Sequence, residues 1–162
     1  LAAGDIDNAL AKFSLLGDYE DAVERVCEIH YTQAEQLLAA GDTDGALAEF
    51  ALAGNYQDAP ERIQAIHYAR AEELLAAGDN DGAATAFEAA GDYEDAPERA
   101  QAIRFAPAEA MEAAGNLGAA AILYGQLGDY PGARERSFTI WEQVADRETV
   151  SAGSWRQICR CP

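Results

Sequence analysis

The chain has 162 residues, enough for one ordinary domain, and its 29 acidic and 11 basic residues give a net charge of −18. A surface this negative repels phosphate backbones and anionic lipids, which argues against nucleic acid and membrane surfaces as partners. Hydrophobic residues make up 49% of the chain, and many of them are alanine, the best helix former, so the composition predicts an all-α fold.

One pattern recurs along the chain at a fixed spacing. Gly41, Gly78 and Gly115 are separated by 78−41 = 37 and 115−78 = 37 residues. Two series of aromatic residues follow the same period, Phe13/Phe50/Phe87/Tyr124 and Tyr19/Tyr56/Tyr93/Tyr130. A period of this length with two helical patterns per unit is typical of an α-solenoid. We therefore predict a right-handed α-solenoid of antiparallel helix pairs, with about eight helices.

The turn and capping residues of the repeat give the bounds of the expected elements in chain order. The helical repeat domain is predicted over residues 1–145, followed by a C-terminal tail over 146–162. Within the domain the boundaries fall at about 1–20, 21–57, 58–94 and 95–131, with a terminal helix over 132–145. The first unit contains only the second helix of a pair. In the other units the first helix ends at a glycine suited to a C-cap, such as Gly78.

The junctions between units carry helix-start signals. In "DAPE", Asp58 to Glu61, the aspartate is predicted to cap the new helix, Pro60 falls in its first turn, and Glu61 closes a capping box. Asp21 and Asp95 repeat the device. Pro107 lies inside a predicted helix and removes the bond to the Ile103 carbonyl, so a kink or a break is expected there.

The tail shows a different character. Glu148 to Trp155, "ETVSAGSW", is strand-like and weakly resembles the opening of a repeat from β-propellers of the chromosome-condensation-regulator type. The following residues do not continue that pattern, and an irregular tail is the preferred interpretation. We predict a short irregular or strand-like segment.

The second half of each unit resembles a tetratricopeptide repeat. In Ala39 to Gly54, "AAGDTDGALAEFALAG", the Gly-Asp turn is followed by a small residue, an aromatic and another small residue at the spacing of that motif. The positions are Gly41, Ala46, Phe50 and Ala53, and one period later Gly78, Ala83, Phe87 and Ala90. The resemblance implies that the first helix of each pair lines a concave face. The chain departs from it in its period, which is 37, and in having His30, His67 and Arg104 where the family has an early aromatic, a position that only Trp141 satisfies.

Sequence motifs for catalysis and for cofactor binding are absent, so we expect a protein that is not an enzyme and that binds no cofactor or metal. No nucleophile has an evident base, and there is no phosphate-binding loop. "GDTDG" and "GDNDG" resemble part of a calcium loop, but helix capping by their aspartates explains them with fewer assumptions. His30 and His67 are interpreted as packing residues. Cys27, Cys159 and Cys161 form no disulfide framework.

A candidate binding face follows from the phase of the first helix in each pair. Tyr31, Tyr68 and Phe105 recur at one position, and Glu35, Glu72 and Glu109 at another. On the concave face they would form an aromatic ladder beside an acidic one. The alternative is that the rings are buried between helices and the glutamates are simply solvated.

These observations predict a non-catalytic module that binds a protein or peptide, with basic ligands favoured. The alternative is a structural spacer that presents a neighbouring domain, such as a β-propeller, and binds nothing in its own groove. No signal peptide or transmembrane run is in view, which favours the cytoplasm, but the chain begins with Leu1, so a signal further upstream is not visible. The sequence does not specify the oligomeric state.

Overall fold

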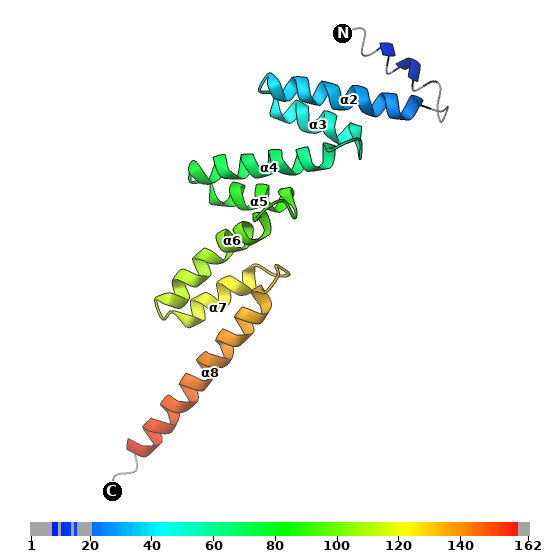
Figure 1. Ribbon diagram of the computed structural model, residues 1–162. Coiled ribbons are helices and arrows are strands. Elements are labelled where there is room, and N and C mark those ends of the chain that lie inside the picture. The colour runs from blue at the N-terminus through cyan, green and yellow to red at the C-terminus, as the bar shows by residue number, and fades with distance from the viewer. Residues whose placement is uncertain (1–7, 10, 14, 16–20, 159–162) are drawn as a thin grey trace. The chain divides into compact units, whose positions relative to one another are not determined.

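The computed structural model describes residues 8–9, 11–13, 15 and 21–158, with side chains up to residue 147. The fold is all-α, as predicted, and no strand occurs among the described residues. The helices that can be bounded there are α2 Ala22–Ala39, α3 Thr43–Ala53, α4 Ala59–Ala76, α5 Asn80–Ala90, α6 Ala96–Ala113, α7 Leu117–Gln126 and α8 Ala133–Ile158 (Figure 1). The helix expected within 1–20 lies largely outside the described residues.

The chain divides into two compact units, residues 1–99 and 100–162, with the division inside α6. In the first unit α2 packs against α3 and α4 against α5, and α3 also contacts α4. In the second unit α7 packs against α8. In the first unit α2 with α3 and α4 with α5 are therefore pairs joined by short turns, as the repeat pattern predicts, while α3 with α4 and α7 with α8 are contacts between successive repeats.

The turns inside the pairs are built by an aspartate and a glycine three residues apart. The Asp42 carboxylate accepts a hydrogen bond from the Gly45 amide at 3.0 Å, and Asp79 repeats this with Gly82. A Cβ at Gly45 would lie only 2.5 Å from the Asp42 carboxylate, so glycine makes room for the cap. One period later the pair is Asn116 and Ala119, and there no side-chain cap bond forms.

The capping box predicted between units is wrong for Asp21 and Asp58. Both residues stand at the N-cap position, but neither side chain caps its helix. The Asp58 carboxylate is bound elsewhere, by the Tyr31 hydroxyl and by Arg62 Nε. A strong charged acceptor takes the best donors within reach, and here those donors are side chains, one of them on another helix.

Two expectations about the C-terminal part, a break at Pro107 and a non-helical tail from residue 146, are also wrong. α6 is one continuous helix with Pro107 inside it, so the proline does not split it, and Phe105 and Ala108 on either side are buried in the core of the second unit. α8 does not end near residue 145. It continues to Ile158, which makes most of the expected strand-like tail helical. A strand there would have needed a partner to satisfy its backbone groups, whereas a helix satisfies them internally.

The core is made of alanine and a few rings. Phe50, Phe87 and Tyr124 are 0% exposed and occupy the same position in successive repeats. In the first unit Phe50 is surrounded by Ala34, Ala46, Ala53, Ala59 and Ile66. Leu37 and Leu74 on the first helices of the two pairs are only half-buried. Small side chains let the helices approach closely, so each fully buried ring carries a large share of the apolar burial.

Replacing Phe50 with alanine should therefore cost about 3–5 kcal/mol of unfolding free energy, because it removes buried surface and leaves a cavity. Leu52 lies on the same helix but is 58% exposed, and Leu52→Ala should cost less than about 1 kcal/mol. Urea unfolding followed by circular dichroism would measure both. Equal costs would contradict the assignment of the buried face of α3.

Candidate functional site

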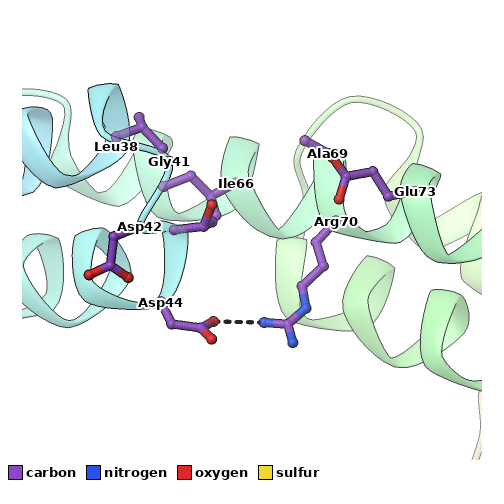
Figure 2. Close-up of a pocket in the computed structure, with 9 residues that line it drawn as sticks. Leu38, Gly41, Asp42, Asp44, Ile66, Ala69, Arg70 and Glu73 are labelled. Atoms are coloured by element: carbon purple, nitrogen blue, oxygen red, sulfur yellow. Dashed lines mark hydrogen bonds and ion pairs between the residues drawn. The ribbon is translucent and has the colours of Figure 1, made fainter.

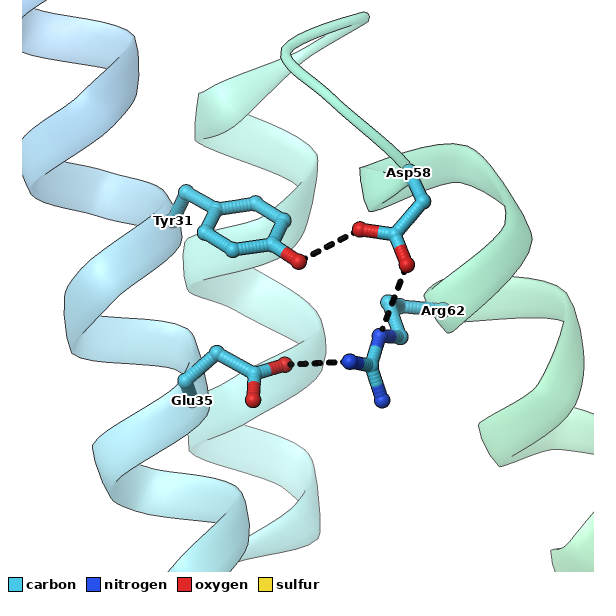
Figure 3. A network of polar contacts seen from close by, with 4 residues as sticks. All are labelled: Tyr31, Glu35, Asp58 and Arg62. Atoms are coloured by element: carbon cyan, nitrogen blue, oxygen red, sulfur yellow. Dashed lines mark hydrogen bonds and ion pairs between the residues drawn. The ribbon is translucent and has the colours of Figure 1, made fainter.

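The predicted binding residues of the first repeat belong to a network that joins two repeats (Figure 3). The Tyr31 ring on α2 packs edge-on against Phe50 at 5.4 Å and against Tyr56 at 5.8 Å between centroids. Its hydroxyl donates to Asp58, the residue before α4. Arg62 on α4 contacts Asp58 at 3.1 Å and Glu35 on α2 at 3.5 Å.

The second repeat builds the same network. The Tyr68 ring packs against Phe87 at 5.3 Å and Tyr93 at 5.6 Å, and its hydroxyl donates to Asp95 at 2.5 Å. Arg99 donates to Glu72 at 2.8 Å and to the Tyr68 hydroxyl at 2.9 Å. The Arg99 guanidinium also lies 4.5 Å from the centroid of the Phe87 ring, a cation–π contact.

We call this arrangement the repeat staple: a tyrosine and a glutamate one helical turn apart, bound to an aspartate and an arginine one turn apart in the next repeat. The offset between partners is 27 residues for Tyr31–Asp58, for Tyr68–Asp95 and for Glu72–Arg99. The sequence analysis named Asp58 and Asp95 as helix caps and missed their tyrosine partners across the junction. The constant offset of 27 was the signal that could have revealed them.

The third repeat lacks the hydroxyl and the aspartate together. Phe105 packs on Tyr124 at 5.2 Å and Tyr130 at 5.9 Å, but it has no hydroxyl, and Gly132 stands where the aspartate would be. The backbone explains the glycine. In the earlier junctions Gln57 and Glu94 take a positive φ of 49° and 48°, but their equivalent is Pro131, whose ring forbids it.

The residue with a positive φ is therefore one position later, at Gly132, with φ 79°. Glycine adopts this conformation without a steric penalty. The arginine partner has shifted as well. Arg136 pairs with Glu112 at 2.9 Å and lies over the Tyr124 ring, 5.7 Å from its centroid. Glu109 is exposed and acts on Arg136 only as a more distant charge.

Most residues of the predicted binding face therefore make contacts within the protein. The rings are half-buried or buried and pack on other rings, while Glu35 and Glu72 are held by arginines. The aromatic ladder is part of the packing between helices. Contact of these residues with a ligand stays a prediction.

Electrostatics follow from the staple. The hydrogen bond from Tyr31 holds the pKa of the Asp58 carboxyl below its ordinary value, and the same bond raises the pKa of the Tyr31 hydroxyl. The Tyr68 hydroxyl has a raised pKa as well, first because of Asp95. The hydrogen bond stabilises the protein most when the aspartate carboxylate is charged and the tyrosine hydroxyl is neutral. Both groups are in these states near neutral pH.

An open pocket of about 430 Å³ lies beside the turn between α2 and α3, against α4 (Figure 2). Leu38, Ile66 and Ala69 supply its apolar lining, and the polar side chains at its rim are Asp42, Asp44, Arg70 and Glu73. Arg70 reaches across to Asp44 at 3.0 Å, drawn as the dashed line in Figure 2. A volume of this size is within the range of about 300–1,000 Å³ usual for ligand pockets.

The histidines occupy equivalent positions with different surroundings. His30 Nδ1 lies 2.7 Å from a Glu49 carboxylate oxygen on α3, with only 13% of the His30 side chain exposed. His67 has no such partner, since its equivalent of Glu49 is Ala86, and burial together with Arg70 lowers its pKa. Among the described residues no group of three or more His, Cys, Asp or Glu side chains is placed to hold a metal ion.

Comparisons with known proteins give no relative: no family model matches the chain, and neither do any of the curated proteins or solved structures. Among the described residues, no helix has the length and apolar character needed to cross a membrane.

The staple predicts a characteristic pH dependence. Tyr31→Phe should lower the melting temperature by about 2–4 °C near neutral pH. A lowered carboxyl pKa stabilises the fold only above its ordinary value of about 4, and a raised phenol pKa only below about 10. The difference from wild type should therefore be constant between about pH 5 and 9 and shrink on both sides.

Tyr56→Phe is the matched control, because Tyr56 packs on the same ring while its hydroxyl is not part of the staple. Melting temperatures of wild type, Tyr31→Phe and Tyr56→Phe, measured across this pH range, would test the prediction. A Tyr31→Phe effect that persists unchanged at pH 3 would mean that the hydroxyl does not depend on the charge of Asp58.

Proposed function

We propose that the protein is a non-catalytic interaction module that binds basic segments of other proteins. The observation that supports this most is the balance and the pairing of its charged side chains. Residues 21–99 contain 18 acidic and 4 basic residues, a balance of 4−18 = −14. All four arginines of that stretch are already paired with carboxylates of the protein itself. The remaining carboxylates leave a strong negative potential, which attracts cationic ligands.

We propose that the basic segment meets acidic residues other than Glu35 and Glu72. Glu35 and Glu72 serve the staple, and their removal would take one carboxylate partner each from Arg62 and Arg99. Replacing these two glutamates with glutamine would therefore alter stability and charge together. Exposed acids for which the described part of the chain shows no arginine partner, such as Glu73 at the pocket, are better placed to meet a partner.

A spacer that presents a neighbouring domain is the second candidate, and the staple supports it. The same tyrosine–aspartate bond occurs before α4 and before α6, and within the first unit it ties the α2/α3 pair to α4. Such a device serves a spacer as well as a binding module. The two candidates differ in whether the acidic surface has a ligand.

The proposal predicts that the protein binds an arginine-rich peptide with micromolar or weaker affinity, because exposed ion pairs contribute only about 0–1 kcal/mol each. Binding should weaken from low to physiological ionic strength as the screening length falls to about 8 Å. Fluorescence anisotropy with a labelled peptide would measure it, and a peptide with glutamine in place of arginine is the control. No binding at low salt, or equal binding of the two peptides, would favour the spacer.

A further inference from the structure

The pocket beside the turn between α2 and α3 carries charged residues that the repeat itself does not require. Asp42 recurs one period later as Asp79, and both cap a helix. Arg70 and Glu73 do not recur. Their equivalents are Gln33 and Gln36 one period earlier, and Pro107 and Ala110 one period later. Residues that recur in register serve the repeated architecture, whereas these two are specific to one repeat.

The pocket combines an apolar wall with an excess of negative charge. Leu38, Ile66 and Ala69 line one part of it. The charged lining of the pocket consists of three carboxylates, those of Asp42, Asp44 and Glu73, and one guanidinium, that of Arg70, which contacts Asp44. The local balance is 1−3 = −2. A long side chain with an apolar stem and a positive end matches both features, since such side chains bury their methylenes and keep the charge at the surface.

The existing ion pair is open to exchange. The side chains of Arg70 and Asp44 are 51% and 82% exposed, and exposed pairs of this kind are weak because water and salt screen them. The pocket therefore already accommodates a guanidinium beside a carboxylate, and a second cation can take a share of the same carboxylates.

We propose that this pocket binds an arginine or lysine side chain from a segment of a partner protein. The stem of that side chain lies along Leu38 and Ile66, and its charge meets Glu73 and Asp44. This proposal rests on the proposed function. It specifies one pocket of the first unit as the part of the acidic surface that binds the basic segment.

The test compares two double variants that remove the same charge. Asp44→Asn with Glu73→Gln changes the pocket, and Glu61→Gln with Glu98→Gln changes two exposed acids at the starts of α4 and α6. A third variant, Ala69→Gln, fills the pocket without changing the charge. Circular dichroism verifies that each variant is folded. The probes are the labelled arginine-rich peptide, its lysine counterpart and the glutamine control.

We expect the pocket double variant to bind the arginine-rich peptide about tenfold more weakly than wild type. Ala69→Gln should weaken it as well, while the control double variant stays within about twofold of wild type.

Equal weakening of both double variants, with Ala69→Gln unchanged, would overturn the pocket and leave diffuse attraction, so the proposed function would survive. Wild-type binding that no variant alters would overturn the pocket in the same way. Failure of the wild type to bind either basic peptide at low salt would overturn the pocket and the proposed function together.

Discussion

The hydrogen bond from a tyrosine of one repeat to the aspartate that opens the next is the contact on which the junctions of the first unit depend. Tyr31 and Tyr68 each place a ring over the buried phenylalanine of their own pair and a hydroxyl on the following aspartate. The ring is therefore fixed by packing on one side and by a charge-assisted bond on the other. Arginine and glutamate repeat the connection one helical turn away, so each junction is held at two points.

The third repeat shows that the two halves of this bond belong together. Once Pro131 excludes a positive φ, the left-handed residue becomes Gly132, and the aspartate has no place. The matching tyrosine is absent as well, since Phe105 stands at that position. Phe105 is buried, so a hydroxyl there would lack its acceptor in the interior, which costs stability. The helix cap inside each pair changes in the same way. The third repeat has Asn116 and Ala119 in place of aspartate and glycine, and Asn116 makes no side-chain cap bond.

Much of the fold could be predicted from the sequence, because period and helix punctuation are local properties. Gly41 and Gly78 end their helices with a φ of 83° and 82°, as the C-cap pattern implies. What could not be predicted depended on contacts across the chain. Asp58 looked like a helix cap because its partner Tyr31 lies 27 residues away, and Glu35 was placed on a binding face because its partner Arg62 also belongs to the next repeat. The length of α8 was missed because Thr149 and Val150 favour strands only where a neighbouring strand exists.

Tyrosine and aspartate act as one unit across the junction, and a double-mutant cycle measures their coupling. Unfolding free energies of wild type, Tyr31→Phe, Asp58→Ala and the double variant, measured in urea at neutral pH, give the interaction between the two side chains. We expect the two single changes to be strongly non-additive, so that once Asp58 is gone the loss of the Tyr31 hydroxyl costs little more. Strictly additive effects would show that the two side chains stabilise the protein independently, and would contradict the staple.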